Sequence, residues 1–182
     1  MDAGEFQRLS FMLKTIESLE INQASEADIP ALYQFYEASG KSDVGYFESL
    51  FEKDTVILLA YLDKSLVAFG VLNFEPKYSL YQKLDIPEIQ DLNVLPDHRQ
   101  QGIATALVTA FETLAHDQGA QSIGISVGLT KNYGPAQRLY FKMGYMPDGN
   151  GITYDRQGVC VGQVYNADDN LCLMMVKNFE PF

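Results

Sequence analysis

The residues that could do chemistry gather in residues 91–105, where an apolar run ends at Val94 and an amphipathic helical pattern follows a polar turn. The first turn of a helix leaves backbone N–H groups without partners, and these groups lie at the positive end of the helix dipole. A pyrophosphate can accept their hydrogen bonds. Gly102 lets a phosphate oxygen approach the backbone, Ala104 keeps the next position small, and Thr105 adds a hydroxyl donor. The stretch fits a phosphate-binding helix terminus, although the spacing alone favours a plain helix start.

The elements on either side must hold this turn in place, and hydrophobic periodicity predicts them. Residues 75–87 are expected to be irregular, and the strands at 55–61 and 66–74 are expected to form a hairpin. This order predicts a mixed α/β domain with one sheet and helices on both faces. Helices are expected at 25–39, 43–53, 100–118 and 136–143, and strands at 21–24, 55–61, 66–74, 88–94, 122–127, 153–154 and 171–177.

The start of the chain carries two further signals. Residues 1–20 show an amphipathic pattern, which predicts an N-terminal helical extension to a domain that spans residues 21–182. Ser25 and Asp28 form a variant of the capping box at the start of the next helix, and Gly40 follows its end.

The composition fits one domain, since the chain has 182 residues of which 47% are hydrophobic. The formal net charge is −11, and such a surface repels phosphate backbones, so nucleic-acid binding is not expected. The same charge suits a cationic acceptor. A polyphosphate would therefore have to be held by local backbone geometry rather than by a basic patch.

Metal, disulfide and membrane functions are not indicated. Cys160 and Cys172 lie in no metal or redox spacing, and His98 and His116 have no partner at ligand spacing. No stretch reaches the roughly 20 apolar residues of a membrane span. The acidic N-terminus does not look like a secretory signal, so a cytoplasmic location is expected.

Two motifs resemble the GNAT superfamily of N-acetyltransferases. Arg99-x-x-Gly102-x-Ala104 is similar to the superfamily's Arg/Gln-x-x-Gly-x-Gly/Ala signature and lies between an apolar strand and an amphipathic helix, as it does there. About 30 residues later, a second block resembles the superfamily's Asn…Ala…Leu-Tyr…Gly-Phe/Tyr pattern. It comprises Asn132, Ala136, Leu139, Tyr140, Gly144 and Tyr145. The run from Tyr133 to Tyr140, with the following Gly144-Tyr145-Met146-Pro147-Asp148-Gly149, resembles one bacterial subgroup.

The resemblance spans roughly residues 21–178 and implies a fold and a cofactor site. The implied fold is a single mixed, mostly antiparallel sheet with a central splayed strand pair and helices on both faces. The co-substrate would be acetyl-CoA, with no metal. The residues implied to bind it are Leu92, Asn93 and Val94 along the pantetheine arm, Tyr140 near the thioester sulfur, and Arg99, Gln100, Gln101, Gly102, Ile103, Ala104, Thr105 and Asn132.

The resemblance also implies a mechanism of direct attack by an amine on the thioester. An alkylammonium, with a pKa near ~10.4, must lose a proton before it attacks. Tyr140 would protonate the leaving thiolate, and the Val94 N–H would stabilise the oxyanion. Glu88 is the preferred candidate for the base, since it lies eleven residues before Arg99, an offset at which a glutamate serves as base in the histone-acetylating branch of the superfamily. Asp91 is the second candidate, with a water chain or no dedicated base as alternatives. On a regular strand these two carboxylates point to opposite faces, because their separation is odd.

The acceptor stays open between small-molecule and protein amines. Several aromatic residues are candidates to line its pocket or simply to fill the core, namely Tyr46, Phe47, Phe74, Tyr78 and Tyr81. The sequence therefore predicts an acyl-CoA-dependent N-acyltransferase, with a non-catalytic acyl-CoA-binding regulatory module as the alternative. A homodimer is plausible through the N-terminal extension or a free sheet edge.

Overall fold

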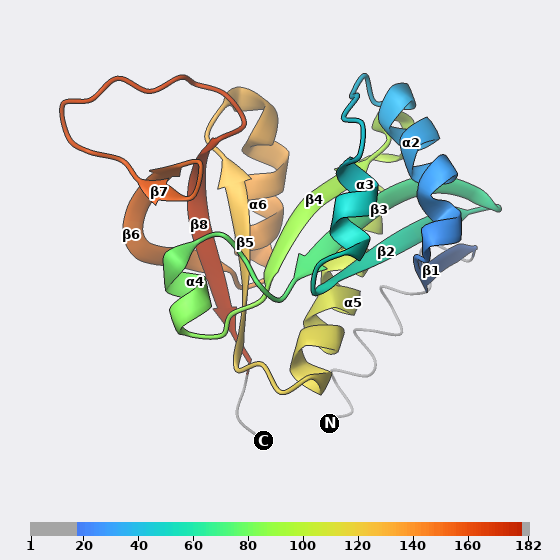
Figure 1. Cartoon of the computed structure of the whole chain (residues 1–182), viewed down its shortest axis with the longest axis horizontal. Helices are drawn as coiled ribbons and strands as arrows, with labels where there is room; N and C mark the ends of the chain where they lie inside the picture. The colour runs from blue at the N-terminus through green and yellow to red at the C-terminus, as the bar shows by residue number, and fades with distance from the viewer. Residues whose placement is uncertain (1–17, 180–182) are drawn as a thin grey trace. The chain divides into compact units, whose positions relative to one another are not determined.

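The computed structural model describes residues 18–179 (Figure 1). The predicted helix at 1–20 lies almost wholly outside the described residues, and its last two residues instead begin the first strand. The strands are β1 (Leu19–Gln23), β2 (Thr55–Leu62), β3 (Ser65–Asn73), β4 (Glu88–Val94), β5 (Ser122–Gly128), β6 (Met146–Tyr154), β7 (Gln157–Gly158) and β8 (Leu171–Asn178). The helices are α2 (Ile29–Ala38), α3 (Tyr46–Phe51), α4 (Ser79–Lys83), α5 (Ile103–Asp117) and α6 (Gly134–Lys142), with 3-10 turns η1 (Glu26–Asp28), η2 (Pro96–His98) and η3 (Lys131–Tyr133).

The strands form one eight-stranded sheet in the order β1-β2-β3-β4-β5-β8-β6-β7. The β1–β2, β5–β8, β6–β8 and β6–β7 ladders are antiparallel. Strands β4 and β5 pair in parallel, at Glu88 with Gly124 and at Ile89 with Ile125, near the beginning of both strands. The predicted fold class, a mixed and mostly antiparallel sheet with helices, is confirmed.

The chain divides into two compact units. The first contains residues 18–71 together with Asp91–Thr109, and the second contains Leu72–Gln90 together with residues 110–179. Strands β3 and β4 and helix α5 contribute residues to both units, so each unit is described by itself.

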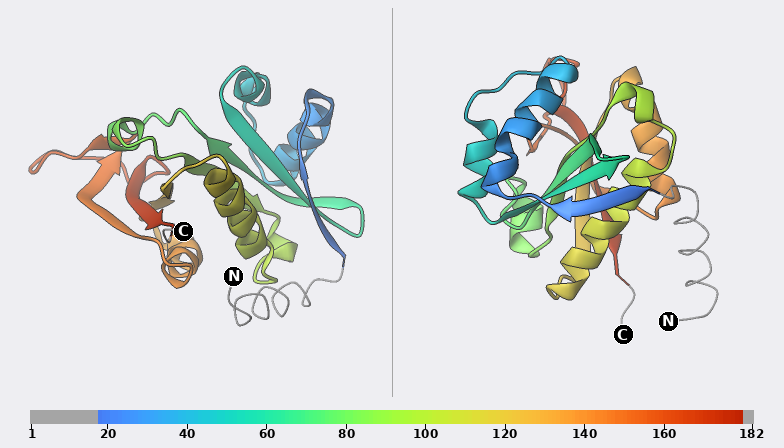
Figure 2. Two further views of the ribbon diagram at one scale, coloured as in Figure 1. Left: turned by 90° about the horizontal axis from the view of Figure 1, so that it is seen from below. Right: turned by 90° about the vertical axis from the view of Figure 1, so that its right-hand side faces the viewer.

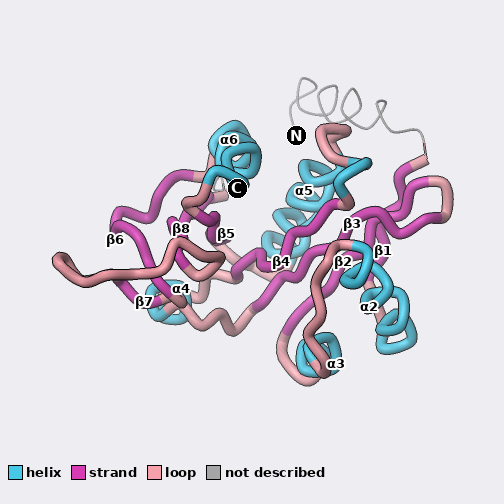
Figure 3. The backbone as a smooth tube through the Cα atoms, turned by 90° about the horizontal axis from the view of Figure 1, so that it is seen from above, coloured by secondary structure: helices cyan, strands magenta, loops and turns pink. Residues whose placement is uncertain are grey.

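The first unit has a core built from β2, β3 and two helices. The nearly continuous apolar runs of β2 and β3 are buried at their centres, as expected for strands covered on both faces. Helices α2 and α3 cover one face of these strands and the beginning of α5 covers the other, as Figures 2 and 3 show. The core residues are Leu32, Phe35, Tyr36, Phe47, Leu50, Ile57, Leu59, Phe69 and Val71.

The predicted capping signals are present at the start of the 3-10 turn η1, which leads into α2, and at the C-terminal end of α2. The Asp28 carboxylate accepts a hydrogen bond from the Ser25 backbone N–H at 2.8 Å. At the other end Gly40 has φ +71, a left-handed conformation that glycine adopts without a steric penalty. The capping box therefore begins the helical segment of η1 and α2 at Ser25, and Gly40 ends it.

The second unit is built around the antiparallel β5–β8 pair, which runs in register from Ser122 opposite Asn178 to Gly128 opposite Cys172. Helix α4 lies on one face of its strands and α6 on the other (Figure 3). The Tyr81 ring covers Gly124, where an added Cβ would lie only 2.2 Å from the ring, and the Tyr81 hydroxyl donates to the Met175 carbonyl at 2.7 Å. Gly124 is therefore required for α4 to pack on the sheet.

Three predictions of secondary structure were inaccurate. Residues 75–87 contain α4, a helix of five residues that is too short to show a helical period in the sequence. The helix predicted at 43–53 is helical only from Tyr46 to Phe51. Strand β6 begins at Met146 rather than at residue 153, because it continues past an irregularity between Pro147 and Ile152. None of the helices in the described part of the chain is long and apolar enough to cross a membrane.

Candidate active site

Strand β4 changes its backbone conformation at Asp91. This residue has φ +48, in the left-handed region that aspartate tolerates better than most residues. The Asn93 side-chain amide donates to the Asp91 carbonyl at 2.7 Å and so satisfies a group that regular pairing would otherwise use. The prediction that Glu88 and Asp91 point to opposite faces assumed regular alternation, and the backbone at Asp91 interrupts that alternation. Leu92, Asn93 and Val94, which follow, are half-buried.

The turn after β4 is held by its own side chains. The Leu95 N–H donates to the Val67 carbonyl at 2.9 Å, which ties the end of β4 to β3. The Arg99 guanidinium donates to the Val94 carbonyl at 3.0 Å, and the Gln101 amide donates to the Asp97 carbonyl at 3.2 Å. Arg99 therefore closes the turn as well as lying in the predicted phosphate-binding stretch.

The backbone leading into α5 has two left-handed residues, Gln100 with φ +61 and Gly102 with φ +87. Alternation of left- and right-handed residues turns successive N–H groups to one side, which forms an anion-binding concavity. The Gly102 carbonyl accepts the Ala106 N–H at 3.0 Å and so begins the helix. Ile103 is 1% exposed, so its side chain is buried in the core. Ala104 and Thr105 are half-buried on the first turn.

Asp91 is exposed and accepts a hydrogen bond from the Tyr46 hydroxyl. Tyr46 begins α3, and its ring stacks on that of Tyr36 with centroids 5.7 Å apart. Burial, and then the negative charge of Asp91, raise the pKa of Tyr46 far above its ordinary value of 10.0. Tyr46 is therefore protonated at neutral pH and remains a donor to the Asp91 carboxylate.

Glu88, the other candidate base, is fully buried at the start of β4. Its Oε1 accepts from the Arg156 guanidinium at 3.1 and 3.2 Å, and its Oε2 accepts from the Gln90 amide at 3.0 Å. Arg156 also donates to the Ser126 hydroxyl at 3.1 Å. The Glu88 carboxylate is thus paired with a cation, and each of its two oxygens accepts a hydrogen bond.

Sequence reasoning did not identify Arg156. It occupies the tight turn between β6 and β7, where Asp155 and Arg156 have φ +49 and +64. An exposed ion pair between Lys77 and Asp155, at 2.7 Å, ties this turn to the segment that precedes α4. Asp155–Arg156 follows an apparent strand end and could have been recognised as a turn, but nothing in the spacing indicates the partner 68 residues earlier.

Tyr140, the predicted acid, lies in α6 and is 6% exposed. Burial raises the pKa of its hydroxyl well above the ordinary value of 10.0. Its ring lies near that of Tyr145, with centroids 6.1 Å apart. Asn132, the predicted cofactor residue of the same unit, is exposed in η3. Asp91 and residues 92–105 belong to the first unit, whereas Glu88, Asn132 and Tyr140 belong to the second.

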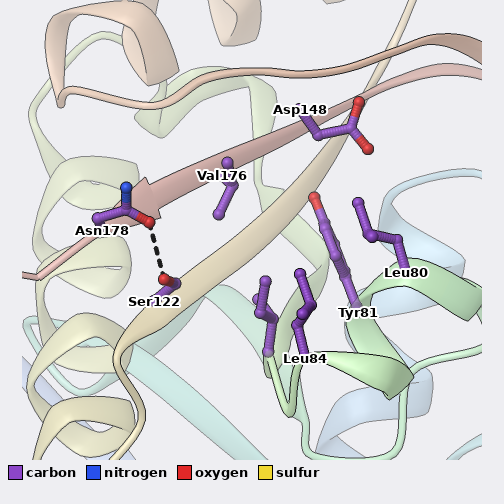
Figure 4. Close-up of a pocket in the computed structure, with 8 residues that line it drawn as sticks. Leu80, Tyr81, Leu84, Ser122, Asp148, Val176 and Asn178 are labelled. Carbon is purple, nitrogen blue, oxygen red and sulfur yellow. Dashed lines mark hydrogen bonds between the residues drawn. The ribbon is translucent and has the colours of Figure 1, made fainter.

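The second unit also contains a cavity of about 340 Å³ between α4 and the β5–β8 pair (Figure 4). Asp148 lies at one end, and its carboxylate accepts the Tyr78 hydroxyl at 2.6 Å. At the other end the Ser122 hydroxyl donates to the side-chain oxygen Oδ1 of Asn178 at 2.8 Å. The remaining walls are Leu80, Tyr81, Leu84, Ile86 and Val176.

The aromatic residues considered for an acceptor pocket lie in different places in the structure. Phe47 is fully buried in the core of the first unit, so the core reading is correct for it. Tyr81 lines the cavity of the second unit, and Tyr78 lies in the cluster beside it. Tyr46 contacts Asp91 instead.

The family model described as "Acetyltransferase (GNAT) family" matches residues 21–145. No curated protein sequence matches the chain. Solved structures match the chain with low sequence identity over most of its length, so these matches establish the fold and not the activity.

The ribosomal-protein-S18-alanine N-acetyltransferase of Escherichia coli has a TM-score of 0.66 at 16% identity, over 88% of this chain and 93% of that one. Ard1 of Thermoplasma volcanium has a TM-score of 0.67 at 20% identity, over 90% and 99% of the two chains. A GNAT family acetyltransferase of Elizabethkingia anophelis, solved with acetyl-CoA bound, has a TM-score of 0.63 at 14% identity, over 89% and 99%.

Proposed function

The chain belongs to the acetyltransferase (GNAT) family of acyl-CoA-dependent N-acyltransferases, and on that premise we propose that it transfers an acetyl group from acetyl-CoA to a primary amine. The observation that carries the proposal is the family match over residues 21–145, which includes the whole turn from β4 into α5. The acetyl-CoA complex of the Elizabethkingia enzyme, which shares the fold, supports acetyl-CoA as the donor.

The residues proposed to hold acetyl-CoA are those of the β4–α5 turn. The two left-handed residues, Gln100 and Gly102, direct the backbone N–H groups that would bind the pyrophosphate. This arrangement suits a protein of net charge −11, because it needs no cluster of basic side chains. Leu92, Asn93 and Val94 are proposed to pair with the pantetheine arm through their backbone.

For the base we propose Asp91 rather than Glu88. The Asp91 carboxylate is exposed, so an acceptor ammonium can reach it, and the Tyr46 hydroxyl orients it. Glu88 is fully buried and bound to Arg156 and Gln90, so its carboxylate would have to break these contacts before it could accept a proton. Glu88 is therefore proposed to stabilise the sheet.

The acid is proposed to be Tyr140. A general acid must carry its proton at the working pH, and burial favours the neutral phenol because the charged phenolate is poorly solvated there. Arrival of the proton on the departing thiolate would complete the transfer.

The experiment is a continuous assay of CoA thiol release with a panel of amines. The panel contains a polyamine, an amino acid, a peptide with a free N-terminus and a peptide with a lysine and a blocked N-terminus. We expect at least one amine to release thiol, and Gly102→Glu to abolish the release, because its carboxylate would occupy the position of the pyrophosphate. Asp91→Asn should lower kcat/KM by about 10²-fold and Glu88→Gln by much less.

The assay also separates the proposal from its alternative. If acetyl-CoA binds the wild-type chain but no amine releases thiol, the chain is a non-catalytic acyl-CoA-binding module. If Glu88→Gln is the more damaging substitution at unchanged folding stability, the assignment of the base to Asp91 is wrong.

A further inference from the structure

Lys41 is held in a fixed place by the end of α2. Gly40 adopts the left-handed conformation that ends the helix, and its N–H donates to the Glu37 carbonyl at 3.0 Å. The Lys41 N–H then donates to the Tyr36 carbonyl at 2.9 Å. This pair of hydrogen bonds is a Schellman motif, which sets the direction in which the chain leaves the helix. The Lys41 side chain therefore starts from a defined position.

The Lys41 ammonium reaches β4. Its Nζ donates to the Asn93 Oδ1 at 2.9 Å and lies over the Tyr36 ring, 5.6 Å from the centroid. An aromatic face attracts a cation, and a carbonyl oxygen accepts its hydrogen bond. The ring of Tyr36 stacks on that of Tyr46, whose hydroxyl donates to Asp91. A primary alkylammonium of the chain itself thus sits against the strand segment proposed to hold the acyl donor.

We propose that Lys41 is a site of intramolecular acetylation, with acetyl-CoA as donor. The inference rests on the proposed function, since the same β4 segment and the same donor are used. It goes further by naming an acceptor within the chain and by defining the group that the Asn93 amide and the Tyr36 ring recognise. That group is the primary ammonium at the end of a flexible alkyl chain.

The step balances with acetyl-CoA as the only co-reactant. The ammonium first releases a proton to solvent, and the neutral amine then attacks the thioester carbonyl carbon. A C–N bond forms, the C–S bond breaks, and the second amine proton ends on the CoA thiolate. The products are the acetylated lysine and free CoA.

Acetylation would also change the surface beside β4. The amide nitrogen of an acetylated lysine carries no charge, so the attraction to the Tyr36 ring is lost. The amide N–H of the acetylated side chain can still donate to Asn93, so this contact loses its charge rather than its hydrogen bond.

The test incubates the purified full chain with acetyl-CoA and follows intact mass and peptide maps. Lys53 and Lys64, both exposed residues of the same unit, report the chemical background. We expect Lys41 to gain one acetyl group at least about tenfold faster than either, because it is held near the donor. Its half-time should not depend on protein concentration, as for any reaction within one chain.

Three variants test whether the acetylation is specific to Lys41. Lys41→Arg should remove the fast acetylation and the matched variant Lys64→Arg should not, while Asn93→Ala should slow it. Equal rates at Lys41, Lys53 and Lys64, or an equal rate at Lys41 in Gly102→Glu, would mean chemical acetylation only and would overturn the proposal. A rate that rises with protein concentration would overturn its intramolecular nature.

Thermal unfolding measured in parallel distinguishes failure of the inference about Lys41 from failure of the proposed function. If acetyl-CoA raises the melting temperature but Lys41 is not selectively modified, the inference about Lys41 fails and the proposed function stands. If acetyl-CoA does not bind, the proposed function itself fails.

Discussion

Two carboxylates of one strand have opposite surroundings. Glu88 is 0% exposed and bound to Arg156, whereas Asp91 is exposed and accepts hydrogen bonds from the Tyr46 hydroxyl and the Asn93 side-chain amide. The distinction follows from burial, because a fully buried carboxylate must be paired to be tolerated. For this reason the residue proposed as base is Asp91, which the sequence placed second to Glu88.

The Tyr140→Phe variant tests the residue proposed as general acid. Removing the hydroxyl should lower kcat by about 10²-fold and leave the KM for acetyl-CoA nearly unchanged, because the phenol acts only in the transition state. Steady-state kinetics at saturating amine measure both constants. Wild-type kcat in this variant would remove Tyr140 from the mechanism.

The pH dependence of the wild-type enzyme belongs to the same prediction. Burial raises the pKa of Tyr140, so the acid keeps its proton above the ordinary value of 10.0. The rate should rise as the amine loses its proton, and no fall from loss of the acid should occur up to about pH 10. A fall with an apparent pKa well below that value, retained in Tyr140→Phe, would identify a different acid.

At the scale of elements, the sequence predicted the strands whose apolar pattern is strong. Strand β4 lies where it was expected, Glu88–Val94, and α5 differs from its prediction only at its ends. Strand β6 was missed over its first half because Pro147, Gly149 and Gly151 are residues that weaken strands, and Gly149 and Gly151 have positive φ there. The pairing of the β6–β7 turn with Glu88 depends on tertiary structure, which no local pattern encodes.

The buried ion pair between Arg156 and Glu88 is expected to stabilise the second unit. Arg156→Gln should destabilise the protein by about 3 kcal/mol, because it leaves the buried Glu88 carboxylate without a cation. Urea unfolding measures the loss as a lower midpoint at an unchanged slope. The matched control is Lys77→Gln, which removes the exposed ion pair with Asp155 from the same turn and should have little effect. Equal losses in the two variants would contradict a special role for the buried pair.

For the whole molecule, a net charge of −11 must be reconciled with a polyanionic co-substrate. We propose that backbone N–H groups at the start of α5 resolve this, since their dipoles act only over a short range and leave the rest of the surface acidic. The sequence predicted this turn through Gly102, but not the left-handed Gln100 that accompanies it. The acidic surface remains free to attract a cationic amine.

The most direct test is thermal unfolding of the full chain with acetyl-CoA, CoA or ATP. At 100 times its Kd, a ligand of the native state should stabilise it by about 2.7 kcal/mol, a rise in Tm of roughly 5–10 °C for a chain of this size. We predict this rise with acetyl-CoA and CoA, its absence with ATP, and its loss in Gly102→Glu. No shift with acetyl-CoA or CoA in the wild-type chain would contradict an acyl-CoA-dependent function.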